Sequence, residues 1–183
     1  GSGKPTLLSA LSGMDRAKAG QVIYNGKNLA AAREKELSEL RNTDFGFIFQ
    51  QMHLVSNLSL TENVLVSGYL NKSVPAAKVK ERAEELFSKM DIGRVKTHLP
   101  SQVSGGEQQR TAILRAIVNN PQMLFADEPT GALDSKTGDS IIKFLLQYAH
   151  NANKTILLVT HDKDIAAQCD RVIEMADGRI ASA

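Results

Sequence analysis

The sequence predicts an α/β fold in which helices cover a largely parallel sheet, and two observations carry that prediction. Short, continuously apolar runs rich in β-branched or aromatic residues recur at 22–24, 45–49, 123–126 and 155–159. Continuous rather than alternating apolarity is typical of strands buried on both faces of a parallel sheet. Helical patterns lie between these runs, and strands separated by helices indicate an α/β core.

Helices are predicted where apolar residues recur at a spacing of about 3.6 residues. One begins near Thr6, and the others are marked by Val79, Ala83, Leu86, Phe87 and Met90, by Ala112, Ile113, Ala116 and Ile117, and by Ile141, Ile142, Leu145, Leu146 and Ala149. Residues 54–103 are rich in helical pattern and hold no convincing buried strand, so we expect a helical subdomain inserted there. The Asp177-Gly178 pair near the end predicts a hairpin turn.

Length and composition restrict the possible classes of protein. The 183 residues, 42% of them hydrophobic, are enough for one sizeable core and too few for two full domains, so we expect a single domain over 1–183. The net charge is only +2, and basic residues are interspersed with acidic ones, which does not support a nucleic-acid partner. The single cysteine, Cys169, fits a packing or surface role better than a catalytic one.

The chain opens with Gly1, Ser2, Gly3 and Lys4 ahead of a predicted helix, which resembles the second half of a phosphate-binding loop. Glycines let backbone amides approach phosphate oxygens, the helix N-terminus attracts negative charge, and a lysine can reach the β and γ phosphates. Alone, these residues are equally typical of a linker. Because the loop pattern is already under way at Gly1, we expect the natural N-terminus to lie upstream.

Position 5 departs from the phosphate-loop pattern. Such a loop has Ser or Thr after its lysine to place a hydroxyl on Mg²⁺, whereas this chain has Pro5, with Thr6 one step later. Proline offers neither a hydroxyl nor an amide hydrogen, although its ring fits the first turn of a helix. We therefore expect weakened Mg²⁺ placement and weak binding of nucleotide.

Two carboxylates, Asp127 and Glu128, directly follow a predicted buried strand. Open α/β sheets place functional groups at the carboxyl ends of their strands. The first carboxylate can hold Mg²⁺ and the second can polarise an attacking water. The plain alternative is a turn with a helix cap, but the continuation to Asp134 is not what a generic turn predicts.

Residues Ser104, Gly105, Gly106 and Glu107 begin a predicted helix. Ser followed three positions later by Glu is a capping box. Two glycines in the first turn weaken a helix by roughly 1 kcal/mol each relative to alanine, which favours close approach of a phosphate to the backbone. Both interpretations can hold together.

Gln50 and His161 each follow a predicted strand. The Gln50 amide could contact Mg²⁺ or the attacking water, and His161 could hydrogen-bond a γ-phosphate. Taken singly, a glutamine or histidine in such a place is more often a surface or structural residue. His53, His98 and His150 are expected to be structural only.

Taken in order, these motifs resemble the ATP-binding cassette ATPases, and the resemblance covers essentially the whole chain. Gly1 to Lys4 resemble the end of Walker A, Gln50 the Q-loop, 103–108 the signature motif, 123–128 Walker B, 132–134 the D-loop and His161 the switch histidine. Val103 and Glu107 replace the usual leucine and glutamine of the signature. The text from Ala126 to Asp134 resembles the subgroup that serves lipoprotein release, macrolide efflux and antimicrobial-peptide export.

The resemblance implies a fold, cofactors and partners. The fold is a P-loop NTPase core with a helical insertion, here with an incomplete antiparallel β subdomain because the first family strands are absent. The cofactors are ATP and Mg²⁺. The partners are a membrane-embedded permease and a second ATPase subunit in a head-to-tail dimer, at the cytoplasmic face of the inner membrane. Ser104, Gly105 and Gly106 would then bind the nucleotide held by the other subunit.

Three hypotheses about function remain at this point. The first is an ATPase that couples hydrolysis to export across, or extraction from, a membrane. The second is a nucleotide-dependent binding module with impaired catalysis, for which Pro5 is the main reason. The third is a cassette ATPase acting on DNA or ribosomes, but such relatives carry a long coiled coil or tandem cassettes, and the chain has room for neither.

Overall fold

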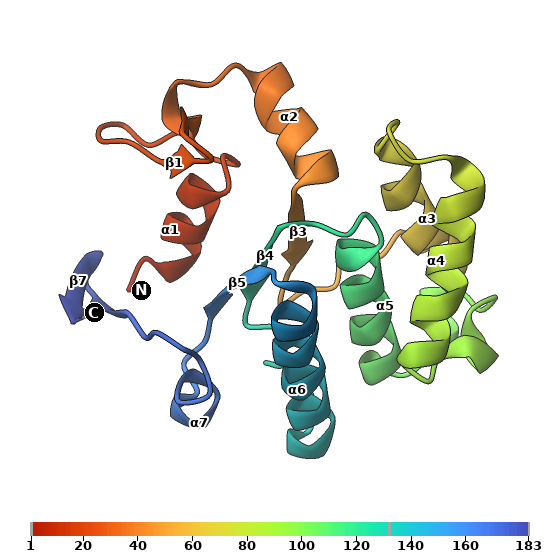
Figure 1. Ribbon diagram of the computed structural model, residues 1–183. Coiled ribbons are helices and arrows are strands. Elements are labelled where there is room, and N and C mark those ends of the chain that lie inside the picture. Colours follow the sequence, from red (N-terminus) through yellow and green to blue (C-terminus); the bar gives the residue numbers. More distant parts are fainter. Residues whose placement is uncertain (1, 132, 183) are drawn as a thin grey trace.

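The computed structural model describes residues 2–131 and 133–182, and its centre is a parallel sheet of 3 strands in the order β3–β4–β5 (Figure 1). The strands are β3 (Phe45–Ile48), β4 (Met123–Asp127) and β5 (Thr155–Val159). They coincide with the last three of the predicted apolar runs. The predicted α/β class with a parallel sheet is therefore confirmed.

Each face of this sheet packs against a different set of helices, because successive side chains of a strand point to opposite faces. On one face, Leu124 and Ala126 join a core cluster with α5 and α6. On the other face, Phe125 packs with Leu8 of α1 and Leu37 of α2. The bounds of these helices are α1 (Lys4–Leu11), α2 (Glu34–Thr43), α5 (Gly105–Ile117) and α6 (Ser135–Ala152).

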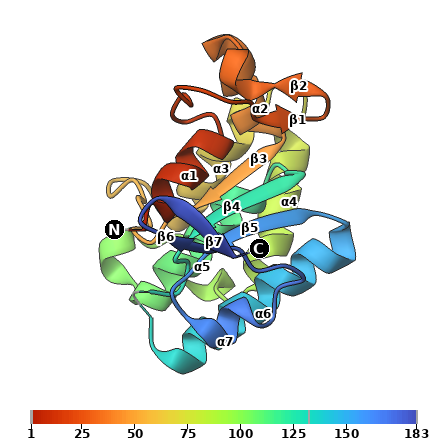
Figure 2. The same ribbon diagram turned by 90° about the vertical axis from the view of Figure 1, so that its left-hand side faces the viewer.

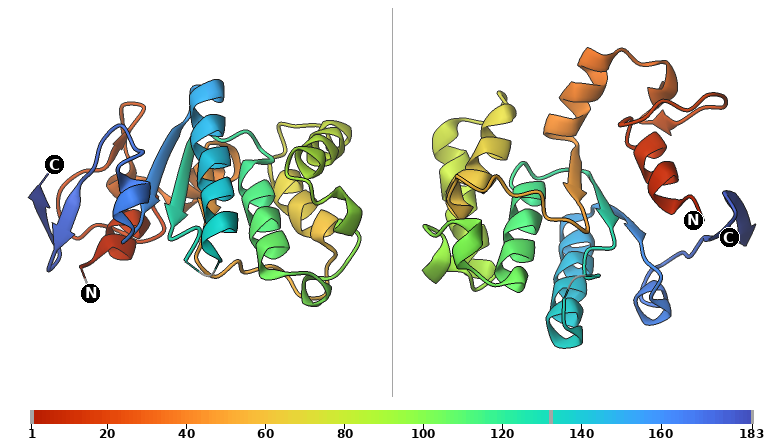
Figure 3. Two further views of the ribbon diagram at one scale, coloured as in Figure 1. Left: turned by 90° about the horizontal axis from the view of Figure 1, so that it is seen from below. Right: turned by 180° about the vertical axis from the view of Figure 1, so that it is seen from behind.

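The segment 54–103 folds as helices that pack on α5, on the side of the molecule away from α1 (Figure 3). It contains α3 (Leu60–Leu70), α4 (Ala76–Lys89) and the short 3₁₀ helices η2 (Gly93–Val95) and η3 (Pro100–Gln102). All of its residues are described, and none lies in a strand. The apolar face predicted for α4 is buried, with Phe87 only 1% exposed. That this segment is a separate subdomain stays a prediction.

The prediction for residues 22–24 was wrong, because Ile23 and Tyr24 form half of a short antiparallel hairpin instead of a buried parallel strand. β1 (Ile23–Tyr24) pairs with β2 (Lys27–Asn28) around Asn25 and Gly26, which both have positive φ. Asn-Gly favours such tight hairpin turns. A strand of two residues, such as β1, is also too short to cross the central sheet. Ile23 is accordingly 58% exposed.

The predicted C-terminal hairpin is confirmed. β6 (Glu174–Ala176) and β7 (Arg179–Ser182) pair antiparallel, and the Asp177 and Gly178 turn between them has positive φ at both residues. The hairpin lies beside the start of α1 (Figure 2), where the Gly178 amide donates to the Ser2 carbonyl at 3.1 Å. The remaining elements are the 3₁₀ helix η1 (Leu29–Ala31) and α7 (Lys163–Ala166).

Among the described residues, no helix is both long and apolar enough to cross a membrane.

Candidate functional site

The carboxyl ends of the three parallel strands bring several of the predicted site residues to one edge of the sheet. Ile48 pairs with Ala126, and Asp127 pairs with Val159. Gln50, Glu128 and His161 therefore follow neighbouring strand ends within two residues of each strand. This edge is where open α/β sheets bind their ligands.

Glu128 is the residue on which the polar side chains of this edge converge. His161 Nδ1 lies 2.9 Å from Glu128 Oε1. A methyl group built in place of a hydrogen on Gly131 would lie 3.1 Å from the Gln50 Nε2 atom and 3.2 Å from Glu128 Oε2. Gln50 and Glu128 thus approach the same glycine from two strands, and a Cβ at position 131 would crowd both side chains.

Glu128 also has a strained backbone. Its φ is +42°, in the left-handed region that residues other than glycine, asparagine and aspartate rarely adopt. Two backbone hydrogen bonds hold it there, because its amide donates to the Val159 carbonyl at 2.9 Å and its carbonyl accepts from the Gly131 amide at 3.1 Å. Strain of this kind persists only where surrounding contacts determine the conformation, and it gathers at functional sites.

Asp127 lies one residue before Glu128, on the α1 side of the sheet by the alternation of β4. Burial, together with the negative charge of Glu128, raises the pKa of the Asp127 carboxyl above its ordinary value. A divalent cation beside these two adjacent carboxyl groups would favour the charged form of Asp127. Among residues 2–131 and 133–182, no cluster of three or more His, Cys, Asp or Glu side chains could hold a metal alone.

The N-terminus of α1 is open, which suits a phosphate. Its N-cap is Gly3 with φ +81°, no side chain caps it, and its first turn holds no acidic residue. Lys4 Nζ lies 3.0 Å from Ser2 Oγ. Pro5 occupies the first turn and removes one amide donor, while the neighbouring Thr6 is exposed. The predicted site residue Gly1 lies outside the described residues.

The N-terminus of α5 is capped, as the capping-box interpretation expects. Ser104 Oγ accepts from the Glu107 amide at 3.3 Å, and Glu107 Oε2 accepts from the Ser104 amide at 2.9 Å. These hydrogen bonds hold the pKa of the Glu107 carboxyl below its usual range, with a smaller effect of Arg94. A Cβ at Gly105 would meet nothing within 4 Å, so that side of the first turn is free to approach another molecule.

Within one chain, the open N-terminus of α1 and the capped N-terminus of α5 are not brought together. Lys4 and Ser104 begin helices on opposite faces of the sheet (Figures 1 and 3). Asp134, another predicted site residue, caps α6, where its Oδ1 accepts from the Thr137 amide at 3.0 Å. The Thr137 methyl group would lie 3.2 Å from a Cβ at Gly106, so α5 and α6 begin side by side.

Two polar residues of α5 contact the site loops and were not predicted from the sequence. Gln109 is 1% exposed, and its Nε2 donates to the Pro129 carbonyl at 2.7 Å. Arg115 donates to the carbonyls of Met52 and His53, both at 2.6 Å, and burial lowers the pKa of its guanidinium. Gln109 lies three positions before the apolar residue Ala112 and so on the predicted buried face of this helix. A polar residue on that face is the sequence feature that could have identified it.

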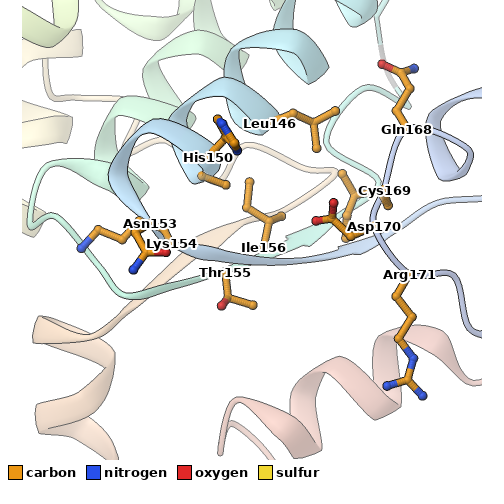
Figure 4. A pocket seen from close by; sticks show the side chains of 12 residues that line it. Leu146, His150, Asn153, Lys154, Thr155, Ile156, Gln168, Cys169, Asp170 and Arg171 are labelled. Atoms are coloured by element: carbon orange, nitrogen blue, oxygen red, sulfur yellow. The ribbon is translucent and has the colours of Figure 1, made fainter.

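A hollow of about 580 Å³ lies elsewhere, between the C-terminal part of α6, the outer side of β5 and the segment after α7 (Figure 4). Its lining includes Leu146, His150, Lys154, Ile156, Cys169 and Arg171. None of the predicted site residues lines it. Burial raises the pKa of the Cys169 thiol, which disfavours a nucleophilic thiolate.

Comparison with known proteins adds three findings. The family described as ABC transporter matches residues 1–131. The macrolide export ATP-binding/permease protein MacB of Wolinella succinogenes is 41% identical over 180 residues, which are 98% of this chain and 28% of that protein. MacB of a Shewanella species is 43% identical over 183 residues, covering 100% of this chain and 28% of that protein. The chain thus spans less than a third of the length of these relatives.

Solved structures give the same fold. A dimeric post-hydrolysis state of the ATP-binding cassette MJ0796, bound to ADP and Pi, matches with a TM-score of 0.91 and 35% identity, over 99% of this chain and 79% of that one. The protein cbiO1 of Clostridium perfringens, part of the transporter complex cbiONQ, matches with a TM-score of 0.86 and 29% identity, over 99% and 72%.

Proposed function

Because this chain belongs to the ABC transporter family, we propose that it binds and hydrolyses ATP to drive export or extraction of a substrate by a membrane transporter. The observation that carries this proposal is the convergence of Gln50, Glu128 and His161 at one sheet edge, together with an uncapped helix N-terminus on α1. The likeness to macrolide exporters and to a cassette bound to ADP and Pi supports the same reaction.

Each residue of the site would have its own role in ATP binding and hydrolysis. Lys4 and the free amides of the first turn of α1 bind phosphate oxygens. Glu128 accepts a proton from the attacking water, since an ionised carboxylate is an acceptor only. His161 contacts Glu128 and, from the neighbouring strand end, can reach the terminal phosphate. Gln50 orients the water from the other side of Glu128.

Mg²⁺ fits this site through a small set of protein oxygens. Mg²⁺ in nucleotide sites keeps several waters and uses one or two carboxylates plus phosphate oxygens, so a dedicated cluster is not needed. Asp127 and Gln50 would be the protein ligands. When bound, the ion supplies charge stabilisation to the phosphoryl oxygens. The side chain at position 5 offers Mg²⁺ no ligand, because proline has no hydroxyl group.

We further propose a head-to-tail dimer in which Ser104, Gly105, Gly106 and Glu107 face the nucleotide of the other subunit, with Asp134 at the same interface. Their place on the face of the sheet opposite Lys4, and the open space beside Gly105, support action between chains. The dimeric structures of MJ0796 support it as well.

The membrane partner we propose is a permease, engaged at the cytoplasmic face of the inner membrane. The relatives are described as ATP-binding/permease proteins. The α3 helix presents Val66, Tyr69 and Leu70 with 49%, 42% and 56% of their surfaces exposed. These residues share one helical face by their spacing, and an exposed apolar face of this kind marks a protein contact.

The alternative proposal is a nucleotide-dependent binding module with little turnover. Pro5 in the first turn of α1 is the observation that favours it. The two proposals share the same binding site and differ in the rate of hydrolysis.

The test is Mg-ATP turnover by the protein and by Glu128→Gln. The ATPase proposal expects measurable turnover in the parent chain, a loss of at least about a hundredfold in Glu128→Gln, and retained binding of ATP. The control is Glu62→Gln, the same chemical change at a glutamate that caps α3, in the helical segment 54–103 and outside the proposed nucleotide site. Binding without turnover in the parent would favour the binding module, and equal turnover in Glu128→Gln would refute its role.

A further inference from the structure

Gln109 is a buried polar residue that the proposed reaction does not use directly. It lies in the second turn of α5, is 1% exposed, and reaches across 20 positions of sequence to the loop after β4. Its Nε2 donates to the Pro129 carbonyl at 2.7 Å, which is a short hydrogen bond. Pro129 directly follows Glu128.

The other half of the Gln109 side chain is unpaired. Its Oε1 is buried and has no hydrogen-bond partner in the part of the chain that the structure describes. A buried polar atom without a partner lowers stability, and an apolar side chain of similar size at this position would remove that penalty. Stability of the fold therefore does not explain a glutamine at position 109. The hydrogen bond from its Nε2 to the Pro129 carbonyl is the remaining explanation.

That bond acts on the strained part of the loop. Glu128 has φ +42°, and a residue in this conformation relaxes unless its neighbours are fixed. The Val159 carbonyl fixes the Glu128 amide, and the Gly131 amide fixes the Glu128 carbonyl. Gln109 fixes the next carbonyl along the chain, that of Pro129, so the strained residue is held on both sides.

We propose that Gln109 is a positioning residue, which holds the Glu128 carboxylate in place and links it to the first turns of α5. The inference rests on the proposed ATPase function. The link is short because Ser104 caps α5 only five positions before Gln109. A molecule that binds at the Ser104 end of α5 therefore acts on Glu128 through one helix and one hydrogen bond.

The test compares Gln109→Met with Gln168→Met. Methionine has a similar length and no amide. Gln168 is the matched control, because its Nε2 also donates to a backbone carbonyl, that of Asp164, and it belongs to none of the proposed nucleotide motifs. We expect Gln109→Met to lower kcat by about ten- to a hundredfold, as misplacement of a catalytic group does, with the KM for ATP within about twofold of the parent. The melting temperature should stay within about 3 °C. Gln168→Met should leave kcat unchanged.

Two further measurements isolate the mechanism. In the Glu128→Gln background, Gln109→Met should have no additional effect on the residual rate, because both changes act through one group. Hydrogen exchange, which requires no turnover, should become faster at the Glu128 and Gly131 amides in Gln109→Met and stay unchanged in Gln168→Met. Gln109→Asn, whose amide is too short to reach Pro129, serves if the methionine variant does not fold.

The outcomes separate the two proposals. Unchanged exchange at Glu128 and Gly131 overturns the positioning role, whether or not the protein turns over ATP. An unchanged kcat in an active parent also overturns it and leaves the ATPase function standing. Absence of turnover in the parent counts against the ATPase proposal alone, since exchange still reports on Gln109.

Discussion

His161 Nδ1 lies 2.9 Å from Glu128 Oε1, across the ends of the neighbouring strands β5 and β4. An ionised carboxylate only accepts hydrogen bonds, so the contact places a proton on Nδ1 and leaves Nε2 facing away from Glu128. The histidine side chain is 73% exposed, whereas that of Glu128 is 23% exposed. The Nδ1 edge of the ring therefore orients the carboxylate, and the Nε2 edge is free to meet a ligand.

The first prediction concerns this contact. Replacing His161 with alanine removes the group that orients Glu128, and we expect ATP turnover to fall by about a hundredfold, the lower range for a lost acid–base component. His150→Ala is the control, because His150 lies on α6 away from the carboxylates. Steady-state turnover at saturating ATP is the measurement. Equal rates in the two variants would remove His161 from the reaction.

The second prediction concerns Pro5. Changing Pro5 to serine restores an amide and a hydroxyl at the first turn of α1, and hydrogen bonds to a charged group contribute about 1.5–3 kcal/mol each. We expect tenfold or more tighter Mg-ATP binding, since about 1.4 kcal/mol is a factor of ten. Isothermal titration with and without Mg²⁺ measures it. Pro75→Ser is the control, because Pro75 is the N-cap of α4.

A gain that is independent of Mg²⁺ would assign the effect to the amide rather than the hydroxyl. No change in affinity would show that the proline does not limit nucleotide binding, which contradicts the expectation drawn from the sequence.

The third prediction uses two matched capping boxes. Ser104 and Glu107 cap α5 in the same way as Ser59 and Glu62 cap α3. Changing either serine to alanine should lower stability by about 1 kcal/mol, a shift of roughly 2–4 °C in melting temperature for a domain of this size. Only Ser104→Ala should also reduce ATP turnover, because only Ser104 is proposed to meet a nucleotide.

The fourth prediction asks whether Ser104 acts on the partner's nucleotide. Lys4→Ala and Ser104→Ala are each expected to be inactive or weakly active alone. Mixed in equal amounts, they should recover part of the turnover, since a dimer of one of each contains one site with both residues intact. A mixture no more active than its components would place Ser104 and Lys4 in the same site of one chain.

Features of the fold and the site that depend on neighbouring residues could be predicted from the sequence. The strands β4 and β5 were predictable because their apolar runs are local, and Asp127 and Glu128 were predictable because they follow one of those runs. The short hairpin at Asn25 was not predicted, because the apolar residues before it were interpreted as a buried strand and the Asn-Gly turn that follows them was not used.

Contacts between distant segments were not predictable. The left-handed backbone of Glu128 depends on Val159 and Gly131, and the bond from Gln109 to Pro129 joins a helix to a loop 20 positions away. Neither leaves a periodic signal in the sequence. The same holds for Arg115, whose bonds to Met52 and His53 fix the segment after Gln50 across more than 60 positions.

The last prediction follows from Asp127. Burial and the charge of Glu128 raise its pKa above the ordinary 3.8, so the folded state holds the proton more tightly than the unfolded state. Stability associated with this group is therefore fully present below about pH 4 and is lost as the pH rises through the raised folded pKa. Asp127→Asn removes the charge, and at pH 7 it should melt at a higher temperature than the parent, with the difference shrinking as the pH falls through the raised folded pKa and gone below about pH 4. Melting curves from pH 3 to 8 without Mg²⁺ measure this, with Asp139→Asn on α6 as the control. A gap that is the same at pH 3 and pH 7 would show that ionisation of Asp127 is not its cause.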